Sequence, residues 1–262
     1  MGLNGSKFHL IPILVLLLTI LTLFLLKQIP CNETVDENIL CTRLPKVNVP
    51  PKPSFIGDYD RKWEDIQVLN VYFVDWKDYP EDLLANIIAT ANTWHLYCGI
   101  YFKGTTNIAR SQIRVSLSDG GYSSAIGLET TMPTYKNKVT MHLQGLNNLL
   151  DKKKFKRVIL HEFGHALGLE HELLHPNSKI PWNKDEMYKH YKISDGWEPE
   201  EVDKNIFTPL DPAHYKIYPE FDGSSIMVYA IPKNLTDGKF EIQWPEDISS
   251  QDIIGIMKWY PK

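Results

Sequence analysis

The sequence predicts an α+β domain over residues 63–262, and three observations predict it. Short apolar runs of strand length alternate with segments of helical spacing as far as Leu167. After Leu167, glycine, proline and asparagine become frequent, which is typical of loops. A last apolar segment of helical spacing ends just before Pro261, so the loop-rich half closes with a helix.

Local signals in the sequence indicate where the helices begin and where the chain turns. Pro80 precedes a run with apolar residues at helical spacing, and Ser249 or Ser250 can cap the final helix. Asp119-Gly120-Gly121 indicates a turn between two strands. The expected strands are 66–74, 100–103, 112–118 and 138–143, and the expected helices are 81–95, 154–167 and 249–260.

Composition narrows the class of protein. Of the 262 residues, 43% are hydrophobic and 23% are charged, which excludes wholesale disorder. Lys and Arg total 28 against 32 Asp and Glu, so the net charge is −4 and we expect no nucleic-acid partner. Three cysteines are too few for a disulfide-dense scaffold.

The amino-terminal part predicts export from the cytosol. Residues 10–26 are uncharged and apolar, with Lys7 before them and Lys27 after them. We expect an uncleaved transmembrane signal anchor, with residues 1–9 as a short cytosolic tail; a cleaved signal peptide and a secreted product are the alternative. In the first case the protein is a single-pass type II membrane protein whose main domain is extracellular or lumenal. Residues 27–62 are rich in proline and predict a stem or propeptide-like linker before the domain at 63–262. Asn32 and Asn234 begin acceptor tripeptides for glycosylation, which agrees with export.

The second expected helix carries a metal-binding pattern. His161 and His165 are four residues apart, so they lie about 40° apart on one helix face and can bind one ion. Glu162 is offset from that row and can hydrogen-bond a water at the metal. Gly168 can take the left-handed conformation that turns the chain back, which brings His171 to the same ion. Three imidazoles with a fourth position open to water are typical of a catalytic zinc site with one Zn²⁺ ion.

The segment 161–172, HEFGHALGLEHE, resembles the HExxHxxGxxHE zinc motif of the metzincins, and of the astacin-like family in particular. Ser225-Ile226-Met227-Val228-Tyr229 is similar to the SxMxY methionine turn of that family. The resemblance implies a zincin-type catalytic domain with a twisted mixed sheet and two long helices in an upper lobe, above a loop-rich lower lobe with the C-terminal helix. It also implies that Met227 packs under the imidazoles and that Tyr229 is a second catalytic residue.

Two further expectations come from the same resemblance. Phe55-Ile56-Gly57-Asp58 resembles a propeptide motif whose aspartate occupies the open zinc position, although an ordinary turn explains the same residues. In processed relatives the glutamate after the third histidine pairs with a freed amino terminus. If this chain keeps its amino-terminal segment, we expect Glu172 to bond another donor. Catalytic domains of that family usually carry paired cysteines, and this domain departs from them because it contains only Cys98.

Three smaller features are left with alternatives. Residues 152–157 form a basic run, KKKFKR, which indicates either a solvated helix start or a site for an anionic partner. His175 is either a spare ligand or, as we expect, a surface loop residue. A substrate peptide is expected to lie antiparallel to an edge strand, formed by either 120–124 or 138–143.

These observations predict a zinc metalloendopeptidase that hydrolyses peptide bonds with metal-activated water and Glu162 as general base. The expected partners are a protein or peptide substrate and the membrane through residues 10–26. The alternatives are a catalytically inactive zinc-fold binding or adhesion module at the cell surface, and a zinc hydrolase acting on non-protein amides. The oligomeric state is open.

Overall fold

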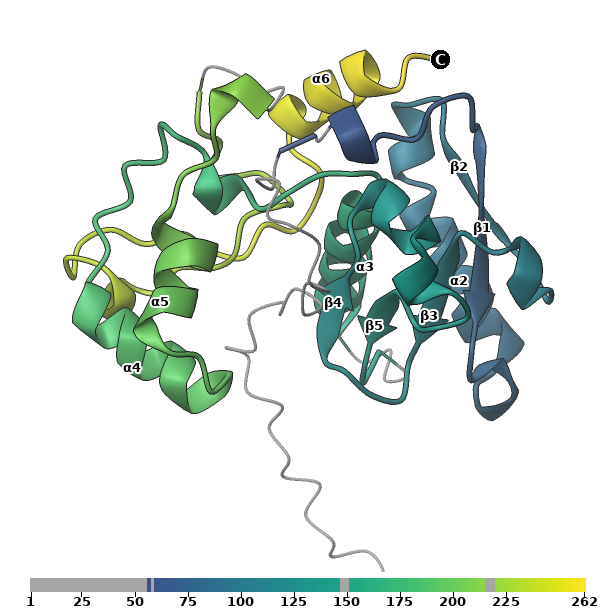
Figure 1. The fold of residues 1–262 in the computed structure, drawn as a ribbon, viewed down its shortest axis with the longest axis horizontal. Helices are drawn as coiled ribbons and strands as arrows, with labels where there is room; N and C mark the ends of the chain where they lie inside the picture. The colour runs from purple at the N-terminus through teal and green to yellow at the C-terminus, as the bar shows by residue number, and fades with distance from the viewer. Residues whose placement is uncertain (1–55, 58, 147–150, 215–219) are drawn as a thin grey trace, which may run out of the picture. The chain divides into compact units, whose positions relative to one another are not determined.

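The structure is a computed structural model that describes residues 56–57, 59–146, 151–214 and 220–262 (Figure 1). All of these residues fall in one compact unit. The predicted segments 1–9 and 10–26, Asn32 and Asp58 lie outside the described residues.

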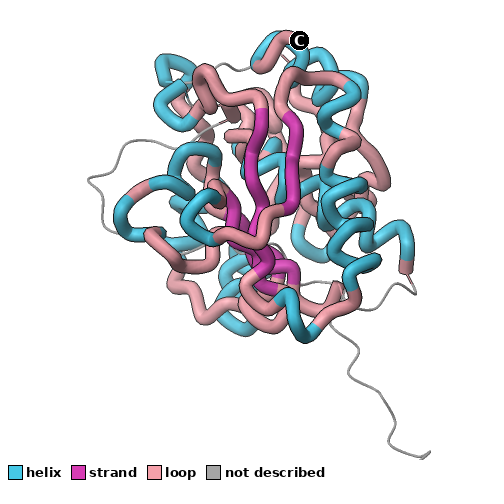
Figure 2. The backbone as a smooth tube through the Cα atoms, turned by 90° about the vertical axis from the view of Figure 1, so that its right-hand side faces the viewer, coloured by secondary structure: helices cyan, strands magenta, loops and turns pink. Residues whose placement is uncertain are grey.

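The sheet has five strands in the order β2-β1-β3-β5-β4. The first four in this order pair in parallel, and β4 pairs with β5 in the antiparallel direction, so the sheet is mixed, as predicted. Figure 2 shows the strands side by side. The strands are β1 (Val68–Phe73), β2 (Tyr101–Gly104), β3 (Ile113–Ser116), β4 (Tyr122–Ser124) and β5 (Met141–Leu143).

Two helices pack on this sheet, α2 (Glu81–Ala91) and α3 (Lys152–Ala166). They contact each other, while α2 also contacts β2 and α3 contacts β4 and β5. Their apolar faces and the inward side chains of the strands form one buried core, in which each fully buried leucine or isoleucine contributes about 1.5–3 kcal/mol. Pro80 occupies the position before α2 and Asp151 accepts a bond from the Lys154 amide at the start of α3, so both helix starts have the local chemistry that favours them.

The second half of the domain contains more helix than the sequence predicted. After α3 the chain forms α4 (Lys184–Ser194), α5 (Pro199–Val202) and a π-helical turn (Asp203–Phe207) before the final helix α6 (Ser250–Trp259). The prediction of loops over 184–207 was therefore wrong. The helix α4 is short and mostly polar, with only Met187 and Tyr191 buried, so its apolar pattern is weak in the sequence.

The start and the end of the domain meet at the carboxyl end of α3. The Trp63 indole N–H donates to the carbonyl of Ala166 at 2.8 Å, and the Tyr260 hydroxyl donates to the carbonyl of Leu167 at 2.9 Å. The last carbonyls of a helix have no partner within it, so these two side chains satisfy groups that would otherwise be buried without bonds. The side chain of Arg61 is packed there as well, 2.8 Å from Glu129, so the packed part of the chain begins before the boundary expected at residue 63.

Candidate metal centre

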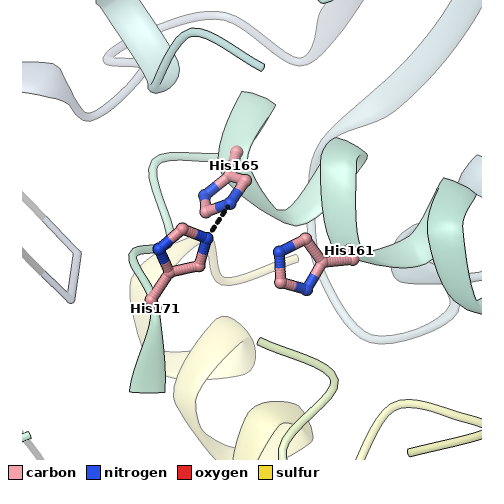
Figure 3. A group of neighbouring side chains, drawn as sticks. All are labelled: His161, His165 and His171. Atoms are coloured by element: carbon pink, nitrogen blue, oxygen red, sulfur yellow. Dashed lines mark hydrogen bonds between the residues drawn. The ribbon is translucent and has the colours of Figure 1, made fainter. Parts of the chain in front are cut away.

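Three buried imidazoles converge where the sequence predicted a metal. His161 and His165 come from α3, and His171 comes from the segment that follows the helix (Figure 3). Each residue is at most 7% exposed, and one ring nitrogen from each lies within 4.8 Å of the other two. Among the residues that the structure describes, this is the one group of three or more potential ligands that the geometry brings together.

The backbone fixes which ring nitrogen faces the centre. The Nδ1 atom of His161 donates to the carbonyl oxygen of Ile226 at 2.7 Å, and Nδ1 of His165 donates to that of Leu169 at 2.7 Å. A carbonyl can only accept, so in the neutral imidazoles the lone pair lies on Nε2. Backbone contacts of this kind orient metal-binding histidines in known metal sites.

The charge state of the cluster also suits a cation. Burial lowers the pKa of His161 to about 4, against a smaller opposing effect of its bond to Ile226, so the ring is neutral at physiological pH. Its Nε2 atom is buried and has no hydrogen-bond partner in the described part of the chain. A neutral imidazole with an unused lone pair, beside two further histidines, matches the ligand set that zinc prefers.

Gly168 makes the third ligand possible. The helix ends at Ala166, and Gly168 then has φ +88°, a left-handed conformation that side-chain-bearing residues rarely adopt. The turn reverses the chain and brings His171 to 2.9 Å from His165, measured between their Nε2 atoms. The role predicted for Gly168 is confirmed.

Met227 packs directly against the metal helix. A Cβ atom added at Gly164 would lie 2.4 Å from the Met227 sulfur, so only glycine between the two helical histidines leaves room for it. Met227 is 2% exposed. The residue that it contacts, Gly164, lies between His161 and His165 in the sequence.

The carboxylate of Asp252 in α6 holds the methionine turn. It accepts from the Ser225 hydroxyl at 2.6 Å and from the Ile226 amide at 2.8 Å. The Ser225 hydroxyl in turn accepts from the Met227 amide at 3.0 Å. Since the carbonyl of Ile226 orients His161, Asp252 acts on the metal cluster through the turn.

Tyr229 and Glu162 both lie at the cluster. The Tyr229 hydroxyl is 2.5 Å from Nε2 of His171, and its ring stacks over His161 with centroids 5.6 Å apart. Glu162 is 1% exposed and follows the first histidine in α3. Burial raises the pKa of Tyr122 on β4, and the negative charge of Glu162 raises it further.

Glu172 borders a separate pocket of about 640 Å³ that is open to solvent and includes none of the three histidines. Its carboxylate accepts from the amide of Asp222 at 3.0 Å, which agrees with the expectation for a chain that keeps its amino-terminal segment. The pKa of Glu172 is raised to about 8, chiefly by burial and also by the nearby carboxylates of Asp252 and Asp222, while the bond from the Asp222 amide opposes the shift. Ile56 lines the same pocket.

The structure settles two alternatives and corrects one expectation. Of the two candidate segments, 120–124 carries β4 at one edge of the sheet, and 138–143 carries β5 inside it. His175 is 1% exposed and its Nδ1 accepts from the amide of Asn177, so the expectation of a surface residue was wrong. It is not among the ligand group of the described residues. Asn234 is exposed, as a glycosylation acceptor must be.

Sequence reasoning missed several residues that build the site. Gly164 was treated as an unconstrained position of the motif, and nothing local to it indicates the contact with Met227. Asp252 could have been found, because Ser249 and Asp252 form a capping box at the start of α6 and its carboxylate is thereby fixed in place.

In the ranges that the structure describes, no helix has the length and apolar character needed to cross a bilayer.

Comparison with known proteins gives structural neighbours only. No protein-family model and no curated protein matches the chain. One structure of myroilysin is 29% identical with a TM-score of 0.71, and covers 79% of this chain and 98% of its own. A second myroilysin structure is 28% identical with a TM-score of 0.59, and covers 85% of this chain and 100% of its own.

A hatching enzyme zinc-protease from Oryzias latipes is 17% identical with a TM-score of 0.49, covering 79% of this chain and 97% of its own, a likeness too weak to support an inference. The myroilysin likeness extends over most of the domain that carries the mixed sheet and the metal helix. In fold, the chain therefore resembles the astacin-like metzincins, a family of zinc metalloproteases, and its three clustered histidines could form a zinc site.

Proposed function

We propose that the chain is a zinc endopeptidase that hydrolyses peptide bonds with Glu162 as general base. One observation supports this more than any other: three buried imidazoles each bring a ring nitrogen within 4.8 Å of the other two. His161, His165 and His171 would hold one zinc ion. When bound, zinc lowers the pKa of water to about 7 and polarises a carbonyl group.

The side chains of the site have separate roles in the proposed reaction. The Glu162 carboxylate takes a proton from the attacking water and later passes it to the leaving amine. The Tyr229 hydroxyl, beside His171, donates a hydrogen bond to the oxyanion that forms on the substrate carbonyl. Met227 supports the imidazoles from below and touches no substrate atom.

The substrate has a sheet edge to bind. β4 is an edge strand, it contacts α3, and Tyr122 to Ser124 carry backbone groups on the side not paired with β5. Extended peptides commonly bind such an edge by backbone hydrogen bonds. We propose that the substrate lies antiparallel to β4.

The test uses the purified full chain with a protein substrate and a mixture of peptides. We expect cleavage that stops with a chelator and returns with zinc. The Glu162→Gln variant should bind zinc as the parent does and lose activity by about 10²–10⁴-fold, because only the proton transfer is removed. Zinc bound without cleavage of any peptide would favour the inactive binding module, and cleavage of non-peptide amides alone would favour the third alternative.

We also propose that residues 10–26 anchor the chain with its carboxyl-terminal part outside the cytosol, and that Asn32 and Asn234 carry glycans. Asp58 is proposed as a zymogen switch, released by cleavage of the chain. Export predicts a mass shift on glycosidase treatment that is lost in the Asn32→Gln/Asn234→Gln double variant. An unchanged mass would contradict the proposed glycosylation.

A further inference from the structure

Arg61 connects the start of the domain to the turn that carries the third histidine. Its Nη2 atom lies 2.8 Å from an oxygen of Glu129, and its Nη1 atom lies 3.9 Å from an oxygen of Glu170. The side chain of Arg61 is 12% exposed and that of Glu170 is 1% exposed, so these charges are almost removed from water. A buried carboxylate is costly unless a cation accompanies it, whereas an exposed ion pair contributes little. The charge of Arg61 therefore matters for the burial of Glu170.

The backbone of Arg61 packs against the same turn. A Cβ atom added at Gly127 would lie 2.1 Å from the Arg61 carbonyl oxygen and 3.3 Å from the Cα atom of Gly168. A Cβ atom added at Gly168 would meet the same carbonyl oxygen at 3.6 Å. Trp63, two residues further on, is held by its bond to the carbonyl of Ala166. The backbone of Arg61 is therefore fixed independently of its ion pairs, so the guanidinium is attached to a rigid position.

Glu170 stands between the two residues through which the turn acts on the metal cluster. On one side, the carbonyl oxygen of Leu169 accepts from Nδ1 of His165 at 2.7 Å and orients that ring. On the other side, His171 is itself one of the three clustered histidines. A displacement of Glu170 would therefore move one candidate ligand and the group that orients another.

Replacement of Arg61 by an uncharged residue takes this cation away from Glu170. A buried carboxylate that loses its cation either moves toward water or takes up a proton. Movement toward water displaces the turn on both sides of Glu170. Partners that orient metal ligands change metal affinity by about 10–100-fold when they are replaced. Arg61 acts one residue further from the metal than such a partner, so we expect an effect at the lower end of this range.

We propose that Arg61 is a positioning residue for the zinc site, which acts through Glu170 on His171 and on the carbonyl group that orients His165. The inference rests on the proposed zinc site. Arg61 contacts neither the metal nor the substrate and takes no part in the chemistry. The segment before Trp63 thus belongs to the working domain, although the sequence places it in a linker.

The experiment measures the zinc affinity of the purified full chain by competition with a chromogenic chelator. We expect Arg61→Gln to bind zinc about tenfold more weakly than the parent. Urea denaturation of both proteins without metal shows how much of the effect is on folding alone. Cobalt(II) is then bound in place of zinc, because its visible absorption bands report the geometry of the ligands. We expect the intensity of these bands to differ between Arg61→Gln and the parent.

Further variants test whether Arg61 acts through Glu170. In the double variant Arg61→Gln/Glu170→Gln no charge remains in the buried pair, so the zinc affinity should recover most of the tenfold loss. Arg61→Lys keeps the charge but not the planar set of donors, and its affinity should lie between those of Arg61→Gln and the parent. Arg110→Gln is the matched control. It removes an arginine at an exposed position, and the affinity should stay unchanged.

The outcomes separate this inference from the proposed function. An Arg61→Gln variant that is less stable without metal but binds zinc as the parent does would show a role in folding only and overturn the inference. A double variant that binds zinc no better than Arg61→Gln would also overturn it. If Arg61→Gln does not fold, the comparison of Arg61→Lys with the parent decides, and equal zinc affinity contradicts the inference.

Activity is recorded on the same samples. A parent that binds zinc and cleaves no peptide contradicts the proposed peptidase function, and the zinc affinities of the variants still decide the role of Arg61. A parent that binds no zinc contradicts both.

Discussion

At the scale of single residues, the site depends on side chains that sequence motifs leave unspecified. His161, Glu162 and His165 follow from helical periodicity, and Gly168 and His171 follow from the fixed spacing of the motif beyond the helix. Gly164 does not. Its requirement arises from a distant methionine that happens to pack at that point of the helix, and such a contact is invisible to local patterns.

Replacement of Gly164 by alanine should therefore be costly. The new Cβ would meet the Met227 sulfur at 2.4 Å and the Trp94 ring at 3.4 Å, so Met227 has to move from its place under the histidines. We expect a loss of about 1–3 kcal/mol in unfolding free energy together with weaker zinc binding.

Gly104→Ala is the matched control, because a Cβ atom there meets nothing within 4 Å. Its effect should stay within about 0.5 kcal/mol. Chemical denaturation measures the stability of both variants, and zinc titration measures their affinity for the metal. Equal stability of the two variants would show that a Cβ atom at Gly164 does not displace Met227 at a cost.

Glu172 predicts a pH dependence of stability. Its pKa in the folded chain is raised from 4.5 to about 8, so its contribution to stability is complete below pH 4.5 and is lost as the pH rises through 8. A difference of one in pKa between the folded and unfolded chain corresponds to about 1.4 kcal/mol, so the loss amounts to a few kcal/mol.

The Glu172→Gln variant cannot ionise at this position. The difference in unfolding free energy between the variant and the parent should therefore change in favour of the variant between pH 5 and pH 8, with all other titrating groups cancelling. Urea denaturation at these two pH values measures this difference. A difference that stays constant with pH would show that Glu172 titrates normally.

At the scale of elements, α6 and the methionine turn form one unit. Asp252 caps its own helix start through the Ser249 amide and also binds Ser225 and the Ile226 amide. A helix expected from the sequence only to close the domain thus fixes the turn beneath the metal cluster. The boundaries of α6 were close to those predicted because Ser249 and Asp252 define its start chemically.

Asp252→Ala should destabilise the domain by about 3 kcal/mol, because it leaves several buried donors without an acceptor. We also expect zinc to bind more weakly, since the Ile226 carbonyl that orients His161 loses its support. Glu246→Ala, at an exposed salt bridge with Lys153, is the control and should change stability by less than about 1 kcal/mol. Thermal melting with and without zinc measures both effects. If the two variants melt alike, Asp252 does not hold the turn.

Two elements, α4 and β4, lack a clear hydrophobic period in the sequence. α4 buries little apolar surface, and β4, which the sequence offered only as one of two candidate edge strands, is three residues long. Their positions are set by contacts with distant segments. The segment 130–138 is likewise held by a distant residue. The buried Arg114 donates to the carbonyls of Thr130, Tyr135 and Lys138.

At the scale of the whole molecule, the fold class, the metal cluster and the order of elements could be predicted from the sequence. Each rests on periodicity or on fixed spacing. The amount of helix in the second half and the network of carboxylates around Glu172 could not be predicted, because residues far apart in the chain create them.

Zinc should stabilise the whole domain, because its ligands come from two segments separated by the turn at Gly168. At a hundredfold excess over the dissociation constant, binding to the folded state adds about 2.7 kcal/mol. We expect the melting temperature of the full chain to fall with a chelator and to recover with zinc. The His165→Ala variant should show little response to either. A parent melting temperature that is indifferent to the chelator would contradict a metal held by these histidines.

Because both ends of the domain bond to the carboxyl end of α3, changes at either end should affect the metal helix. Trp63 and Tyr260 hold neighbouring carbonyls at the end of the metal helix, and Gly99 accepts no side chain because Pro261 lies against it. Deleting residues at either end of the domain would remove these hydrogen bonds and destabilise the helix that carries the histidines. Tags and fusion partners should therefore be joined through linkers that leave the contacts of Trp63 and Tyr260 unchanged.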